Sequence, residues 1–185
     1  MAMANDRDTA LAEFCTQQYL IAGTLRTGGQ RLTDLLNDEL FSSVELRHVQ
    51  VMRLINLKEV IASHTSALVE KEGIMLAISR GEGGEATERS YYKRVDTAKW
   101  DVFMTIPSFE LFGRLHVRGT GGLRTALLRW TGQFIPLTDA KAVYSLYPEV
   151  SFSSNVIVVN KSRIETVCLD TKVALRSQRS AGPLT

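Results

Sequence analysis

The sequence predicts a mainly β protein with short helices, built from two tandem copies of one small, strongly bent sheet or partly open barrel. Three observations lead to this fold class. Short motifs recur about 90 residues apart, the apolar segments are short and often alternate with polar residues, and glycine-rich turns separate them. We expect each copy to contain one strand, a short helix and four further strands, and the two copies to be related by a pseudo-twofold axis.

The repeat depends on matched residues in the two halves of the chain. Gly23 and Leu25 match Gly113 and Leu115 at an offset of 90 (113 − 23). The offset grows by two or three residues in the middle and then returns, as small loop insertions do in a duplicated domain. The further matches are Gly28-Gly29 with Gly121-Gly122, Leu35-Leu36 with Leu127-Leu128, Phe41 with Phe134, Glu59-Val60 with Glu149-Val150, Ser63 with Ser153, Lys71 with Lys161, and Ile74 with Ile164.

The first strand of copy one is expected at residues 20–25, where small and apolar side chains alternate. Gly28-Gly29 predicts the turn that follows this strand, because glycine adopts positive φ without steric cost. Thr27 and Gln30 have the spacing of a capping box. A helix is therefore expected to begin directly after the turn.

The remaining elements of copy one follow in order. Residues 31–37 predict a short helix with Leu32, Leu35 and Leu36 on one face and Asn37 at its end. Residues 44–54 alternate, and a change of phase at His48 predicts a β-bulge or a bend. Further strands are expected at 59–62, 67–69 and 73–78 with a turn at 71–73; copy two is expected to have a buried strand at 156–159, a turn at 160–162 and a half-exposed closing strand at 163–169.

This pattern divides the chain into five segments. Each copy is close to the lower size limit for independent stability, so we expect the two copies to pack together or with further chains. Residues 8–18 have the spacing of one or two amphipathic turns through Leu11, Phe14 and Cys15. The segments are an N-terminal extension at 1–17, copy one at 18–80, a charged glycine-rich linker at 81–99, copy two at 100–171, and a polar basic tail at 172–185.

The composition is that of a soluble globular protein. Hydrophobic residues make up 44% and charged residues 23%, and the net charge of +2 is too small to indicate a nucleic-acid binder by itself. Cys15 and Cys168 are the only cysteines and lie far apart, which favours free thiols in a reducing compartment. The first residues lack the pattern of a signal peptide, and no apolar run is long enough to span a membrane. We therefore expect a cytoplasmic, bacterial-type protein.

The residue patterns of enzymes are missing from the sequence. His48, His64 and His116 lie in separate segments without metal-ligand spacing, so we expect neither a metal nor a cofactor. No nucleophile has a base near it in the sequence. Asp34, the most tempting acid, is better placed to stabilise the helix start. We expect no catalytic residues and no enzymatic activity.

Two features leave binding functions open. The Gly-Gly turns precede short helices, whose N–H groups can hold an anion, although neither turn continues into a Walker-type motif; positive φ explains the glycines more simply. Tyr91, Tyr92, Lys93 and Arg94 combine aromatic and basic side chains as single-strand binders do, but acidic residues lie beside them. These four residues are the candidate nucleic-acid contacts.

The run from Gly28 to Asn37, with Gly28, Gly29, Arg31, Asp34 and Asn37 as its motif residues, resembles a bacterial family of uncharacterised domains. Members share G-x-L, then R-L-S/T-D-L-L-N, then F-x-x-L-x-x-A, and the last block matches residues 134–140. The resemblance implies a family without an established activity. A looser similarity to Sm-like small barrels implies fold analogy only.

Two functions remain on these grounds. The first is a non-catalytic structural or protein-interaction protein, a scaffold that binds itself or a larger assembly, because the edge strands of small β modules readily pair with partners. The alternative is a nucleic-acid-binding or nucleotide-binding regulator of the Sm-like type, with Tyr91–Arg94 and the basic tail as contacts.

Overall fold

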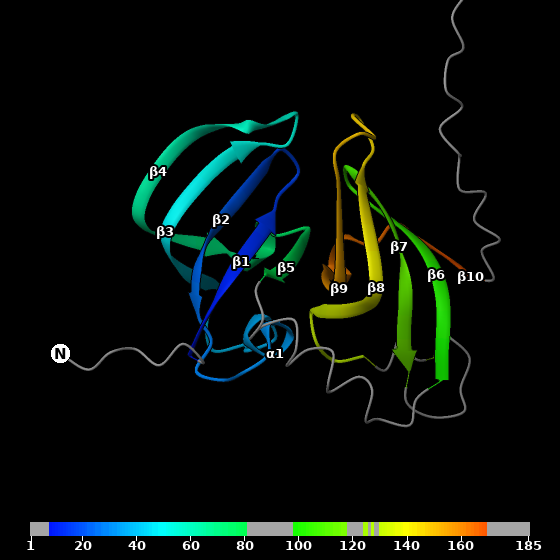
Figure 1. The fold of residues 1–185 in the computed structure, drawn as a ribbon. Helices are drawn as coiled ribbons and strands as arrows, with labels where there is room; N and C mark the ends of the chain where they lie inside the picture. Colours follow the sequence, from blue (N-terminus) through cyan, green and yellow to red (C-terminus); the bar gives the residue numbers. More distant parts are fainter. Residues whose placement is uncertain (1–7, 81–97, 118–123, 126, 128–129, 170–185) are drawn as a thin grey trace, which may run out of the picture.

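The computed structural model describes residues 8–80, 98–117, 124, 125, 127 and 130–169 (Figure 1). Within these residues it is a mainly β fold, with a ten-stranded antiparallel open sheet and the short helix α1 (Leu32–Leu36); Arg124, Thr125 and Leu127 are also helical. The prediction of a mainly β protein with short helices is confirmed at this level. Gly121-Gly122, the predicted second Gly-Gly turn, lies outside the described residues.

The strands fall into two groups of five along the chain, which we call the first half and the second half. Figure 1 shows the two groups side by side, with β5 and β9 adjacent at the junction. The first half contains β1 (Thr9–Cys15), β2 (Tyr19–Arg26), β3 (Ser43–Arg53), β4 (Asn56–Glu70) and β5 (Leu76–Arg80); the second contains β6 (Ala98–Ile106), β7 (Phe109–Val117), β8 (Phe134–Tyr144), β9 (Ser151–Asn160) and β10 (Thr166–Leu169).

The strand order in the sheet is β10-β6-β7-β8-β9-β5-β1-β2-β3-β4. Each half therefore has the same internal order, with its fifth strand at one side and its fourth strand at the other. A twofold axis would bring like edges together and give a palindromic order. The junction instead joins β9, a fourth strand, to β5, a fifth strand. The expected pseudo-twofold relation is wrong, and the halves follow one another head to tail.

Strand β1 occupies the segment in which amphipathic helical turns were expected. It lies in the middle of the sheet, between β5 and β2. Consecutive residues Phe14 and Cys15 are both 0% exposed because the two faces of β1 are covered by different parts of the core. Leu11, Phe14 and Cys15 have helical spacing, but Leu11 is 58% exposed and the other two lie on opposite faces of the strand, so the expected helical stripe is absent.

Two further boundaries differ from the expected ones. Segments 59–62 and 67–69 belong to one 15-residue strand, β4. This strand is an edge strand with mostly exposed residues, so its polar residues gave no reason to expect continuous pairing with β3. The two predicted turns at 71–73 and 160–162 are present as short 3-10 helices at Lys71–Gly73 and Lys161–Arg163.

The predicted bulge in β3 is confirmed and has a counterpart in β8. His48 and Asp139 have φ values of 50° and 48°, at the points where the pairing with β2 and with β7 changes register. A glycine on the neighbouring strand faces each bulge. A Cβ on Gly23 would lie 2.9 Å from the Arg47 carbonyl oxygen, and one on Gly113 would lie 3.1 Å from the Thr138 carbonyl oxygen. The repeated glycine therefore allows a bulged strand to approach closely.

Replacing Gly23 by alanine is expected to lower the free energy of unfolding by about 1–3 kcal/mol, because the added methyl group meets backbone atoms that cannot rotate away. The matched control is Gly73→Ala, since a Cβ on Gly73 meets no atom within 4 Å. That substitution is expected to change stability by less than about 1 kcal/mol. Urea unfolding of both variants measures the difference, and equal losses would contradict the close-approach role of Gly23.

The helix α1 begins directly after the Gly28-Gly29 turn, as predicted, but it lacks the predicted capping box. Gly28 and Gly29 have φ values of 55° and 79°, so the prediction that they supply positive φ is confirmed. The helix N-cap is Arg31, which makes no side-chain capping hydrogen bond. Thr27 Oγ1 instead accepts from Gly29 N at 3.4 Å. The capping-box prediction is wrong, because the two-glycine turn leaves Thr27 too far before the first helical residue.

The strand registers also correct one match between the halves. Ser43 pairs with Glu70 in the first half, and Phe134 pairs with Asn160 in the second, which makes Ser43 the counterpart of Phe134. The predicted match of Phe41 with Phe134 is therefore wrong. The match of Lys71 with Lys161 is confirmed by a shared contact. Each ammonium donates to a carbonyl in the loop before the third strand of its half, to Asp38 O at 2.6 Å and to Trp130 O at 2.5 Å.

Candidate functional site

The junction between β5 and β9 joins the two halves and shows how two edges of this sheet pair. Leu76 lies opposite Val159, and Ala77 lies opposite Val158. Val159 and Leu76 contribute to one hydrophobic cluster, and Val158 and Ala77 contribute to the other. Both faces of this strand pair are therefore buried in the hydrophobic core.

Polar contacts fix the register of the junction. Asn160 is 0% exposed and donates from Nδ2 to Ile74 O at 2.9 Å, while its Oδ1 accepts from Ser162 N at 3.1 Å. Its backbone N–H donates to Met75 O at 3.0 Å. Arg80 bridges the strands on either side of β5, since it donates to Glu13 Oε2 at 3.0 Å and to Ser153 O at 2.9 Å.

A second amide ties the helix of the first half to the second half. Asn37 Nδ2 donates to Phe134 O at 2.9 Å, and Asn37 Oδ1 accepts from Phe134 N at 2.8 Å. One side chain thus satisfies both backbone groups at the start of β8. Gly132 leaves room for this amide, because a Cβ there would lie 2.8 Å from the Asn37 side chain.

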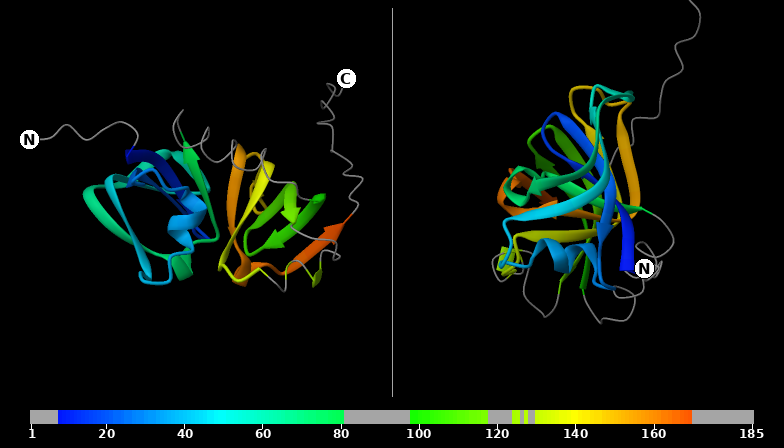
Figure 2. Two further views of the ribbon diagram at one scale, coloured as in Figure 1. Left: turned by 90° about the horizontal axis from the view of Figure 1, so that it is seen from below. Right: turned by 90° about the vertical axis from the view of Figure 1, so that its left-hand side faces the viewer.

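Among the described strands, the two outer ones, β4 and β10, are the open edges of the sheet. Their residues correspond to those of the junction but remain accessible. Leu68 of β4 is 70% exposed, whereas its counterpart in β9, Val158, is 1% exposed. Leu169 of β10 is 41% exposed. Figure 2 shows β4 and β10 at opposite ends of the molecule, so each is available for pairing without the other.

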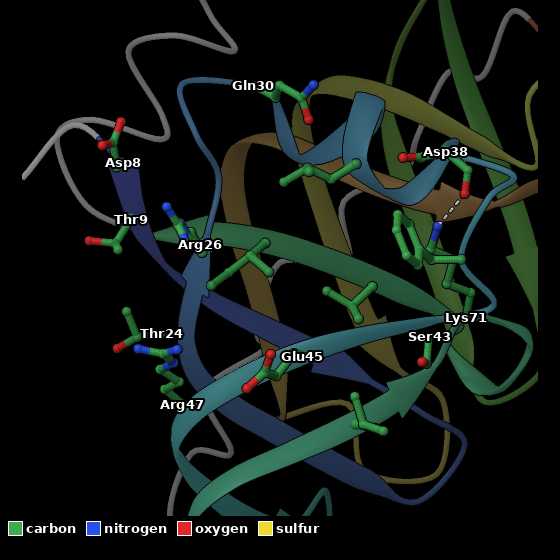
Figure 3. A pocket seen from close by; sticks show the side chains of 15 residues that line it. Asp8, Thr9, Thr24, Arg26, Gln30, Asp38, Ser43, Glu45, Arg47 and Lys71 are labelled. Atoms are coloured by element: carbon green, nitrogen blue, oxygen red, sulfur yellow. Dashed lines mark hydrogen bonds between the residues drawn. The ribbon is translucent and has the colours of Figure 1, made fainter. Parts of the chain in front are cut away.

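A hollow of about 1200 Å³ lies beside β4, between α1, β2 and β3 (Figure 3). Figure 3 shows Arg26, Thr9 and Asp8 on one side of it, and Asp38 with Lys71 on the other. Its acidic and basic side chains balance three against three, so the charge does not select an anion. The lining residues are Asp8, Thr9, Thr24, Leu25, Arg26, Gln30, Leu35, Asp38, Phe41, Ser43, Val44, Glu45, Arg47, Leu68 and Lys71.

The corresponding place in the second half is filled. Phe134, the counterpart of Ser43, is 0% exposed and packs in the same cluster as Leu32 and Leu36 of α1. By the same register Pro136 stands where the first half has Glu45. In the second half, Phe134 packs against α1 of the first half. In the first half, the equivalent position is Ser43, which lines the hollow.

The predicted motif residues have structural roles in the turn and helix. Gly28 and Gly29 form the turn, and Arg31 donates to Asp34 through Nε at 2.7 Å and through a second guanidinium nitrogen. Asp34 lies in the first helical turn, where a carboxylate is favourable. Asn37 was singled out only as the helix end, yet it also reaches Phe134. No sequence signal indicated that partner, which lies 97 residues away.

The candidate nucleic-acid contacts Tyr91, Tyr92, Lys93 and Arg94 lie outside the described residues. Among the residues that the structure describes, no three histidine, cysteine, aspartate or glutamate side chains gather as a metal site would require. Nor does this part of the chain contain a helix that is long and apolar enough to cross a membrane.

Burial is the first cause of the pKa shifts of Cys15, His116 and Lys71. Burial raises the pKa of the Cys15 thiol, with the charge of Glu13 adding to the effect, so this cysteine stays protonated and unreactive. Cys168 is exposed on β10. Burial and then the charge of Lys99 lower the pKa of His116, which lies 2.8 Å from Thr138 Oγ1. Burial likewise lowers the pKa of Lys71.

Comparison with known proteins finds no matching family model, no similar curated protein and no similar solved structure. The resemblance of residues 28–37 to a family of uncharacterised domains therefore stays a prediction. The proposal below is based on the open edges β4 and β10 and on the β5–β9 junction, where two such edges pair within the chain.

Proposed function

We propose that this protein is a non-catalytic assembly protein, composed of two tandem modules, β1–β5 and β6–β10, that binds other polypeptides by strand addition at the open edges of its sheet. The single observation that carries this proposal is the open edge strand β4. From Ala62 to Glu70 its pairing with β3 keeps one register and is interrupted only opposite His48, so the other side of the strand presents a row of backbone donors and acceptors.

Over residues 62–69, beyond the register shifts near Val60, the β4 edge lacks the features by which sheets usually prevent such pairing. Protected edges carry charged side chains, proline or a bulge, or are very short. Strand β4 is 15 residues long, and residues 60–69 include no lysine, arginine, aspartate, glutamate or proline. Val60 and Leu68 are 43% and 70% exposed on this segment. Such an edge is selected against unless a partner covers it.

The experiment compares the full chain with Leu68→Lys, which places a charge on the edge without disturbing a buried side chain. Leu146→Lys, at a residue 69% exposed in the turn between β8 and β9, is the matched control. Size-exclusion chromatography with light scattering measures self-association, and immobilised protein in a cell extract measures capture of other proteins. We expect Leu68→Lys to reduce mass or capture, and Leu146→Lys to retain both.

A monomer at every concentration, with identical capture by wild type and Leu68→Lys, would overturn the proposal. A nucleic-acid arm separates the alternative function. Single-stranded RNA and DNA are titrated at low and high salt, because phosphate contacts give a steep salt dependence. Salt-dependent binding that Leu68→Lys leaves unchanged, together with edge-independent capture, would favour the nucleic-acid alternative.

A further inference from the structure

We infer that the partner of the open β4 edge is the β10 edge of a second copy of this chain, paired as β9 pairs with β5 within the chain. This inference rests on the proposed function, because it names the partner for the same edge. The argument uses three observations: which edges are left open, the register that the internal junction fixes, and the burial that the junction gives to matched residues.

The two open edges are unlike and complementary. The sheet order places a fifth strand, β10, at one end and a fourth strand, β4, at the other. The junction already joins a fourth strand, β9, to a fifth strand, β5, in antiparallel pairing. Each chain therefore carries one edge of each kind needed to repeat its own junction. A contact between unlike edges is heterologous and continues from chain to chain, into a ring or a filament.

The junction predicts the register of the contact between chains. Within the chain Leu76 lies opposite Val159, and Ala77 lies opposite Val158. Moving each residue by the offset of 90 places Thr166 (76 + 90) opposite Val69 (159 − 90) of the next chain. The second junction pair becomes Val167 with Leu68, and extending the antiparallel register by one residue places Cys168 opposite Ala67. Cys168 is exposed on β10, so it can report on this register.

The accessible surface at β4 matches the surface that the junction buries. Leu68 is 70% exposed where Val158 is 1% exposed, and pairing would cover it. The hollow beside β4 lies where the second half places Phe134 against α1, so a neighbouring half has room to approach there. Phe41 lines this hollow and is 64% exposed. A second copy thus covers the exposed side chain of Leu68 together with the hollow that Leu68 and Phe41 line.

The contact between chains is weaker than the internal junction. Ser66 and Glu70 of β4 stand where β9 has Val156 and Asn160. Polar side chains at these positions reduce the apolar area that pairing removes from water. The two halves of one chain are also linked covalently, which raises their effective concentration relative to a separate chain. Self-association is therefore expected to depend on protein concentration.

The test uses disulfide formation between neighbouring chains in the full-length protein. Ala67→Cys places a thiol opposite the native Cys168 of the next chain, where directly opposite Cβ atoms lie about 4.5–5.5 Å apart, next to the roughly 3.5–4.5 Å that a disulfide requires. Thr65→Cys is the matched control, because it lies two residues away on the same face of the same edge, and diagonal neighbours are about 7–8 Å apart. Cys15 is 0% exposed and does not compete.

After mild oxidation we expect Ala67→Cys to form a ladder of multiples of the chain mass on non-reducing gels, with peptides that join positions 67 and 168. Thr65→Cys should form far less, Ala67→Cys with Cys168→Ser should form none, and Ala67→Cys with Leu68→Lys should lose the ladder. Light scattering of the unmodified protein should give a mass that rises with concentration.

Three outcomes would overturn the inference. The first is that Ala67→Cys and Thr65→Cys form equal amounts of cross-linked product. The second is a Cys168–Cys168 disulfide, which would show that two β10 edges pair with each other. The third is a monomeric mass at every concentration. If the protein is monomeric but Leu68→Lys still abolishes capture of other proteins, the proposed function stands and only the identity of the partner is wrong. If neither capture nor mass depends on Leu68, both are wrong.

Discussion

Replacing Phe134 by alanine is expected to lower the free energy of unfolding by about 3–5 kcal/mol, because it empties a fully buried aromatic site. Phe134 is 0% exposed and packs with Leu32 and Leu36 of α1, in a cluster that otherwise belongs mostly to the first half. The cavity therefore opens at the contact between the halves. Urea unfolding followed by circular dichroism measures the loss.

Phe41→Ala is the matched control for this prediction. The sequence pairs Phe41 with Phe134, but Phe41 is 64% exposed. Surface substitutions of this kind usually change stability by about 0.5 kcal/mol or less. A loss at Phe41 as large as that at Phe134 would show that the sequence match, and not the strand register, identifies the equivalent residues.

Replacing Asn160 by alanine is expected to lower the free energy of unfolding by about 2–4 kcal/mol, because each buried polar group left without a partner costs roughly 1–3 kcal/mol. The amide donates to Ile74 O and accepts from Ser162 N, and Ile74 is itself 0% exposed. The substitution leaves both backbone groups without their described partner. It acts on the link between the two halves rather than on either half alone.

Glu70→Ala tests whether the loss of stability expected for Asn160→Ala is specific to the β5–β9 junction. Glu70 occupies the corresponding position on the open β4 edge and is exposed. Its removal is expected to change the stability of the chain by about 0.5 kcal/mol or less. Thermal unfolding of the two variants at one low protein concentration makes the comparison, and a negligible loss for Asn160→Ala would contradict the role of its amide at the junction.

The repeat was the most predictable feature of the fold, because it depends on local sequence. Gly23 and Gly113 recur because a bulge recurs beside each, and Lys71 and Lys161 recur because each ammonium satisfies a loop carbonyl. The α1 helix was also predictable from its three leucines, since a helical stripe is visible over a few residues.

Features that depend on distant pairing were not predictable from the sequence. Strand β1 was missed because Leu11, Phe14 and Cys15 are apolar at helical spacing, although Phe14 and Cys15 lie on opposite faces of the strand and Leu11 is exposed. The partner of Asn37 lies in β8, and no local pattern indicates a contact across the junction. The sequence also could not show that Leu68 lies on an open edge while Val158 is covered, because both belong to apolar segments and only the strand order distinguishes them.

The head-to-tail order of the sheet determines how many halves a larger assembly can contain. One polypeptide contributes two halves, so a closed ring contains an even number of them, and its rotational symmetry is half that number. Junctions around the ring alternate between an internal kind and a kind formed between chains. Dilution then separates the ring only at every second junction and releases whole chains, so the smallest exchangeable unit has two halves.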